Sequence, residues 1–189
     1  MAALAPAGYL AWGAVSNGLG ANPIEAITRE TGTWTLRFLM ITLAVTPFRR
    51  LTGWNDAIKF RRMLGLFAFF YGTLHLLTYV WLDQFFDLAS MVKDVAKRPF
   101  ITAGATAFVL MVPLAVTSTA GMIRRMGGRA WRRLHRLAYA SAVVGVVHYW
   151  WLVKLDTTRP RNYAMILAVL LGVRLFAFLR PRLARRFGT

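Results

Sequence analysis

The sequence of 189 residues contains no cysteine. Disulfides, thiolate metal sites and iron–sulfur clusters are therefore excluded, because each needs a cysteine sulfur. Acidic side chains are also few, at 7 against 24 Lys and Arg. Neither a G-x-G-x-x-G nor a Walker-type loop occurs, and we expect no nucleotide-binding domain. A bound metal would have to use histidine or the nitrogens of a cofactor.

Long apolar runs take up much of the chain, which is 57% hydrophobic and only 16% charged. A soluble domain needs a more polar surface, and a bilayer core takes roughly 20 helical residues per crossing. We predict an all-α integral membrane protein with a bundle of six transmembrane helices in one domain spanning residues 1–189, although five crossings stay open. The first run lacks preceding Lys or Arg and is interpreted as a membrane helix rather than a signal peptide. The predicted spans are Leu4 to Leu19, Trp34 to Phe48, Arg62 to Leu82, Phe100 to Thr119, Leu134 to Val153 and Tyr163 to Leu179.

The formal charge of +17 comes from short basic clusters between the apolar runs. Clusters in such places reflect the orientation of the spans in the membrane and do not indicate a nucleic-acid partner. Alternate loops hold 15 and 7 cationic residues, and the 7 are accompanied by six of the seven acids. The positive-inside rule places the richer set, and with it both termini, in the cytoplasm. That set consists of Arg49, Arg50, Lys59, Arg61, Arg62, Arg124, Arg125, Arg129, Arg132, Arg133, Arg136, Arg180, Arg182, Arg185 and Arg186.

Histidine is the main candidate for chemistry, since no Asp or Glu lies in a predicted span and a proton-driven transporter is disfavoured. His75 in TLHLLTY and His148 in HYWWLVK both lie near outer span ends. Imidazole in hydrocarbon needs a partner, which can be a metal or simply a neighbouring helix. Two neutral imidazoles on facing helices can hold a haem inside a bundle.

His135 in WRRLHRLAY lies near the cytoplasmic ends of the spans, which we call the inner level. It comes 13 residues before His148 and is therefore roughly 20 Å away in depth. An ideal helix would turn these two side chains to different faces unless it were distorted, for example at Gly145. Arg61 precedes His75 by 14 residues and shares its helix face. Arg61 cannot ligate iron, but it can pair with haem propionates or a flavin phosphate. His135 could instead belong to a basic cluster that faces lipid phosphate.

The chain resembles the haem-binding membrane subunits of bacterial protein-methionine-sulfoxide reductase systems, within the ferric reductase-like transmembrane superfamily. The resemblance is carried by NPIEAITRETG at 22–32, RFLMITLAVTPFRRLTG at 37–53, FRRMLGLFAFFYGTLHLLTY at 60–79, KRPFITAG at 97–104, LAVTSTAGM at 114–122, WRRLHRLAY at 131–139 and HYWWLVK at 148–154. It implies that His75, His135 and His148 are the histidines of the haem site, with one haem b or two. Arg61 stands where two-haem members of the superfamily have a fourth histidine. The family is also associated with FMN, which we expect at the level of Arg61 and His135.

The resemblance also implies partners. A periplasmic molybdopterin-dependent subunit would reduce methionine sulfoxide in oxidised envelope proteins, and this chain would supply its electrons across the bacterial inner membrane. The electron donor would be the quinol pool or a cytoplasmic flavin reductase, and the chain would be a redox subunit without catalytic residues of its own. Two alternatives stay open: a ferric reductase or oxidase core, and a cofactor-free transporter or assembly protein whose histidines only pack helices.

Overall fold

The computed structural model describes residues 2–187, with side chains up to residue 180, so the side chains of Arg182, Arg185 and Arg186 lie outside it. Helices make up most of the described part of the chain, and no strand occurs there. They are η1 (Ala2–Leu4), α1 (Ala5–Val15), α2 (Pro23–Thr52), α3 (Ala57–Leu77), the π-helical turn η2 (Thr78–Asp83), α4 (Leu88–Lys97), α5 (Pro99–Val116), α6 (Ala120–Met126), α7 (Gly128–Leu134), α8 (Leu137–Leu152) and α9 (Thr158–Phe187).

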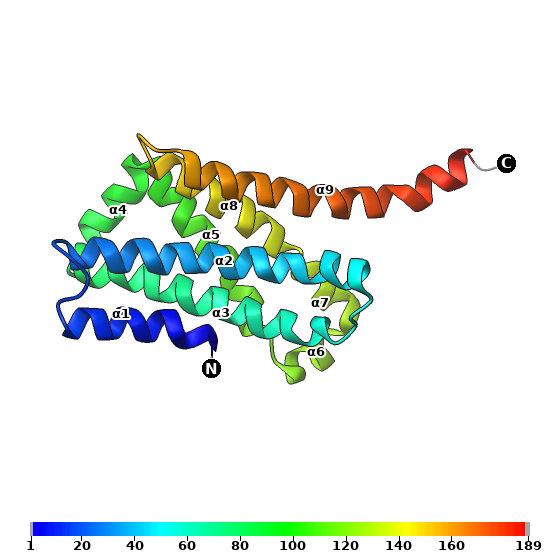
Figure 1. Ribbon diagram of the computed structural model, residues 1–189, viewed down its shortest axis with the longest axis horizontal. Coiled ribbons are helices and arrows are strands. Elements are labelled where there is room, and N and C mark those ends of the chain that lie inside the picture. The colour runs from blue at the N-terminus through cyan, green and yellow to red at the C-terminus, as the bar shows by residue number, and fades with distance from the viewer. Residues whose placement is uncertain (1, 188–189) are drawn as a thin grey trace.

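The long helices lie side by side along one axis (Figure 1). Helices α2, α3, α5 and α8 form a closed ring, in which the most extensive contacts join α2 to α3 and α5 to α8. Helix α9 packs on α2 and α8, and α1 packs on α2. The ring is thus two antiparallel helix pairs placed next to each other. We call the end with α4 and the α8–α9 connection the outer end, and the end with α6 and α7 the inner end (Figure 1).

Local sequence signals explain where the central helices begin and end. Asn22 caps α2 by accepting a hydrogen bond from the amide of Glu25, and Pro23 follows as the first helical residue. The helix ends at Gly53, whose φ of 72° is the left-handed conformation that glycine adopts without strain. Asp87 caps α4, and its hydrogen bonds from Ser90 hold the pKa of this carboxyl below its ordinary value.

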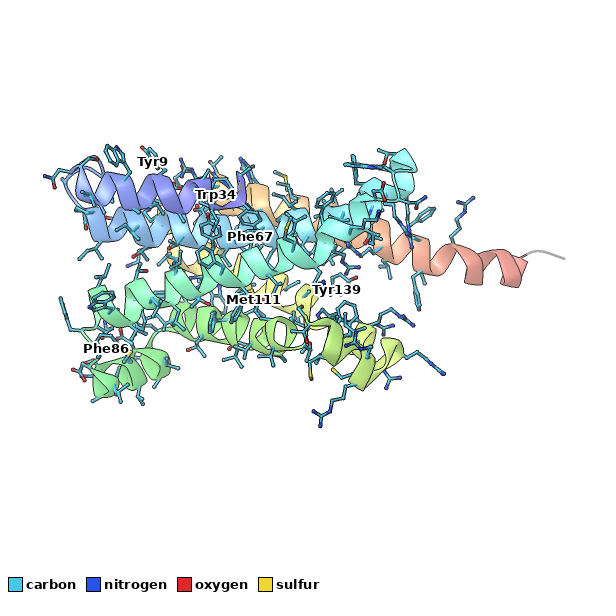
Figure 2. The ribbon with its side chains drawn as sticks, turned by 90° about the horizontal axis from the view of Figure 1, so that it is seen from below. Tyr9, Trp34, Phe67, Phe86, Met111 and Tyr139 are labelled. Atoms are coloured by element: carbon cyan, nitrogen blue, oxygen red, sulfur yellow. The ribbon has the colours of Figure 1, made fainter. Side chains whose placement is uncertain are left out.

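Aromatic side chains fill the interior between the helices. Phe38 of α2 stacks on Phe67 and Tyr71 of α3, with ring centroids 5.6 and 5.4 Å apart. Figure 2 shows Trp34, Phe67 and Met111 in the interior between α2, α3 and α5. This core sits inward of the outer end, where two of the three histidines lie.

Three of the described helices are long and apolar enough to cross a bilayer: Ala57–Asp83, Pro99–Val116 and Thr158–Arg180. The prediction of an all-helical protein with membrane-spanning segments is therefore confirmed. The first apolar helix, Ala2–Val15, is shorter, α8 has 16 residues, and α2 is polar for its length. The other three spans and the orientation stay predictions.

Helix α4 was not predicted from the sequence. It lies at the outer end (Figure 1) and exposes apolar side chains such as Leu88 and Val92. Just before it, Phe85 and Phe86 take φ values of 47° and 62°, which non-glycine residues rarely adopt. The chain thus turns sharply between the end of the third predicted span and this amphipathic helix.

Candidate cofactor site

His75 of α3 and His148 of α8 come together near the outer end of the ring. Their ring centroids are 6.0 Å apart and their planes are inclined by 70°. The two residues lie on different helix pairs, α2/α3 and α5/α8, so the site bridges the two halves of the bundle. The meeting of these two histidines at one level is the arrangement expected from the sequence.

Each of these imidazoles is anchored by one nitrogen to the backbone of the neighbouring helix. His75 Nδ1 lies 2.9 Å from the carbonyl oxygen of Thr28 in α2, and His148 Nδ1 lies 2.6 Å from that of Phe100 in α5. A carbonyl can only accept, so each Nδ1 is the nitrogen that carries hydrogen. Among the described residues no group bonds to either Nε2. Both rings therefore offer an Nε2 lone pair, the form of histidine that binds metals.

A glycine precedes each of these histidines by three residues, Gly72 before His75 and Gly145 before His148. Residues three apart lie on the same helix face, so the surface one turn inward of each imidazole has no side chain. The atoms nearest to where a Cβ would stand are ends of flexible side chains, Met111 Cε at 2.9 Å and Leu36 Cδ2 at 3.2 Å. The closest groups beside both imidazoles can therefore move, while Thr35 Cγ2 and Phe108 Cδ2 lie farther from the Cβ position of Gly72, at 3.5 and 3.6 Å.

His135 lies apart from this pair, at the inner end. Its Nδ1 is 3.1 Å from the carbonyl oxygen of Trp131, its Nε2 is 3.4 Å from Ser118 Oγ, and its ring stacks on Trp131 with centroids 3.8 Å apart. The prediction of one span from Leu134 to Val153 is wrong at its start, because α7 ends at Leu134 and α8 begins at Leu137. His135 therefore lies in the break between α7 and α8, outside the regular helix that carries His148.

Arginines surround His135 at the inner end. Arg61 of α3 is half-buried and lies close enough to act electrostatically on both His135 and Arg174 of α9. Arg174 bonds to the backbone oxygens of Leu170 and Leu43 and lies over the Tyr139 ring at 5.2 Å. The grouping of Arg61 with His135 is thus as expected from the sequence. No carboxylate forms an ion pair with these arginines in the described part of the chain.

Comparisons with known proteins identify the family. The family model described as "Ferric reductase like transmembrane component" matches residues 31–146. A relative from Herminiimonas arsenicoxydans is 58% identical over 93% of this chain and 82% of its own length. Relatives from Azospira oryzae and Bordetella pertussis are 57% and 50% identical, over 94% and 98% of this chain and 76% and 91% of their own. All three are named "Protein-methionine-sulfoxide reductase heme-binding subunit MsrQ".

The chain belongs to this MsrQ family of ferric reductase-like transmembrane proteins. The resemblance stated from the sequence is therefore confirmed. No solved structure matches the chain. The family-model match includes His75, His135 and Arg61, and His148 follows two residues after its end.

Sequence reasoning missed three parts of this MsrQ-family site. Two are the carbonyls of Thr28 and Phe100, which carry no signal of their own because any residue has a backbone oxygen. The third is Arg174, which lies inside the predicted sixth span, where a charged residue is by itself a sign of function. Its position could have been noted from the sequence.

Proposed function

We propose that this chain binds a b-type haem between His75 and His148 and carries electrons across the membrane to a methionine sulfoxide reductase. The observation that carries the proposal is the pair of facing imidazoles, 6.0 Å apart and each fixed at Nδ1 by a backbone carbonyl. Ligand histidines in metalloproteins are oriented in this manner by a second hydrogen bond.

The spacing of the two rings fits ligation from opposite sides of one metal ion. With metal–nitrogen bonds of about 2 Å, two such imidazoles have their centroids roughly 6 Å apart. The 70° between the ring planes is compatible with this, because ligation leaves rotation about the common axis free. His75 and His148 would therefore hold one metal ion between them.

The number of ligands supports a macrocycle rather than a bare metal ion. Among the described residues no group of three His, Cys, Asp or Glu is placed to hold a metal. A protein-bound zinc ion takes three or four protein ligands. Haem iron already has four porphyrin nitrogens, so two histidines complete its coordination.

The glycines beside the histidines support the fit further. At Gly72 and Gly145 the nearest atoms are the ends of the Met111 and Leu36 side chains, which can withdraw from a flat ring. Bound there, the haem iron would supply one-electron transfer. The protein's part is to hold the ligands, set their tautomers and surround the site with the apolar core of α2, α3, α5 and α8.

The partner and the location follow from the family. The relatives' names state a haem-binding subunit of a protein-methionine-sulfoxide reductase. We extend this to a six-helix protein of the bacterial inner membrane with both termini in the cytoplasm. Its outer end would face a periplasmic, molybdopterin-dependent catalytic subunit. The excess of Arg at the inner end supports this orientation.

The inner level would hold an anionic group. Arg61 and Arg174 provide positive charge and hydrogen-bond donors near His135, which suits the phosphate of FMN or the propionates of a second haem. His135 has no second histidine beside it among the described residues. We therefore propose one bis-histidine haem at the outer level and, at the inner level, FMN or a haem held differently.

Two electron donors are compatible with this arrangement, a membrane quinol and a cytoplasmic flavin reductase. A groove of about 670 Å³ between α2, α8 and α9 supports the quinol. Its lining combines apolar residues with the polar or charged Glu30, Thr33, Arg37, Tyr149, Arg159, Asn162 and Tyr163. Tyr149 follows the proposed ligand His148. The arginine-rich inner surface would equally suit an acidic cytoplasmic partner.

The test removes one imidazole at a time. We expect His75→Ala and His148→Ala each to lose the haem of the outer site, measured as haem per chain in the purified protein, because one of its two histidine ligands is gone. His135→Ala is the matched control, with the same change at the inner end, and should keep the outer haem. Normal haem content in both outer variants would contradict the proposal and leave these histidines a packing role.

A further inference from the structure

The neighbours of the two proposed ligands are arranged alike in both halves of the bundle. His75 bonds to the carbonyl of Thr28, and four residues later α2 has Gly32. His148 bonds to the carbonyl of Phe100, and four residues later α5 has Gly104. The same spacing of carbonyl and glycine thus occurs on two helices that are far apart in the sequence.

Helix geometry explains why the glycine stands four residues after the carbonyl. The Cα–Cβ bond of a helical residue tilts towards the helix N-terminus, so a side chain covers the turn that precedes it. The residue at i+4 therefore shields the carbonyl of residue i from neighbouring helices. A glycine at this position leaves that carbonyl open to a second donor.

Steric contacts show that the imidazoles occupy the space that a side chain would need. A Cβ at position 32 would lie 3.0 Å from Cε1 and 3.1 Å from Nδ1 of His75. A Cβ at position 104 would lie 2.9 Å from both Cε1 and Nδ1 of His148. Because the ring atoms are attached to a backbone fixed in the bundle, alanine at either position would displace the ring from its carbonyl.

We propose that Gly32 and Gly104 are positioning residues, which open the Thr28 and Phe100 carbonyls so that these hold His75 and His148 in the ligating tautomer and direction. This inference rests on the proposed haem site. Neither glycine touches the iron; each acts through the histidine that packs on it. Outer hydrogen-bond partners of metal ligands typically change metal affinity by about 10- to 100-fold, and we expect an effect of that size.

The test is haem titration of Gly32→Ala and Gly104→Ala in detergent, together with the electron paramagnetic resonance spectrum of the ferric haem and its midpoint potential. We expect haem affinity to fall by about 10- to 100-fold, and any haem retained to show an altered low-spin signal and a shifted potential. A merely structural glycine would not change the spectrum of the bound haem.

Two controls separate ligand positioning from general packing. Gly65→Ala lies on the same helix as His75 and meets Thr42 Cγ2 at an ordinary 3.7 Å. Gly13→Ala is equally crowded, but the atoms nearest to its Cβ belong to Leu19, with Cδ2 at 2.6 Å, and not to a histidine. Both should bind haem as the wild type does. Losses in the controls equal to those in the test variants, or unchanged affinity, spectrum and potential in the test variants, would overturn the inference.

A measurement on the wild type covers the case in which the variants fail to fold. Nitrogen-15 labelled histidine should show both ligand Nδ1 atoms as hydrogen-bonded donors whose protons exchange slowly with solvent. Freely exchanging Nδ1 protons on a haem-loaded protein would overturn the role of the glycines while leaving the haem site intact. A wild type that takes up no haem would instead overturn the proposed function, and this inference with it.

Discussion

The three histidines differ in what holds their rings. His75 and His148 each bond to the backbone of a neighbouring helix, so their direction is fixed relative to the bundle as a whole. His135 bonds to Trp131 within its own chain segment and stacks on the same residue. The outer pair is therefore preorganised for a shared ligand, whereas both ring nitrogens of His135 already have partners, Trp131 and Ser118.

Arg61 allows a test of the inner level by a single side chain. We expect Arg61→Ala to weaken binding of FMN or of a second haem by at least about tenfold, since a charged hydrogen bond contributes about 1.5–3 kcal/mol. The outer haem should be unaffected. Flavin and haem contents, measured on the same purified sample, give the result. Arg62→Ala, exposed and next in sequence, is the control, and equal cofactor contents in both variants would show that Arg61 has no such role.

The members of this site could be predicted from the sequence only where the side chain itself can bind a metal or an anion. The sequence is sufficient to pair His75 with His148 and Arg61 with His135, because helix rise and periodicity give depth and face. It is not sufficient for Gly32 and Gly104, whose role appears only when the carbonyl of Thr28 or Phe100 is seen against a ring from another helix. Glycine is common in membrane helices wherever two backbones pack closely, so its presence in an apolar run does not by itself indicate a ligand site.

Among the helices, α1 is joined to α3 by hydrogen bonds of one side-chain hydroxyl, that of Tyr71. Tyr71 of α3 donates to the carbonyl of Ala3 at 2.8 Å and accepts from the amide of Ala7 at 3.1 Å. The first amides of a helix lack partners within it, so Tyr71 satisfies one of these groups where water is scarce. This contact links the N-terminal segment to the aromatic core.

Removing the Tyr71 hydroxyl should loosen α1. We expect Tyr71→Phe to lower the free energy of unfolding by about 1–3 kcal/mol for each group left without a partner, and to lower the melting temperature in detergent. Tyr9→Phe is the control, because that side chain is 68% exposed. Equal melting temperatures for the two variants would mean that α1 is held by packing alone.

The helices that hydropathy locates best are the apolar ones. The predicted spans Arg62 to Leu82 and Phe100 to Thr119 correspond closely to α3 with η2 and to α5. Helices α4, α6 and α7 have no long apolar run and were missed. The break between Leu134 and Leu137 was missed as well, because a hydropathy pattern records where a chain is buried and not where its hydrogen bonding is interrupted.

At the scale of the whole molecule, the absence of cysteine makes the orientation directly testable. Leu155, between α8 and α9, is 99% exposed, and Arg129 in α7 is exposed at the opposite end. We expect Leu155→Cys to react with a membrane-impermeant maleimide in intact spheroplasts, and Arg129→Cys to react only after permeabilisation. The reverse pattern would contradict a cytoplasmic inner end.

The two helix pairs of the ring each contribute one histidine and one open carbonyl, so a haem at their junction would also join the two halves of the protein. Binding of a ligand to the folded state stabilises it by mass action. The central claim is that this junction holds haem b.

The most direct test is the dithionite-reduced minus oxidised visible spectrum of the wild-type protein in mild detergent, with haem, flavin and protein quantified on the same sample. We expect a b-type spectrum with at least one haem per chain. A protein that shows no haem as purified, and takes up none when haem is added to the folded protein, would contradict it.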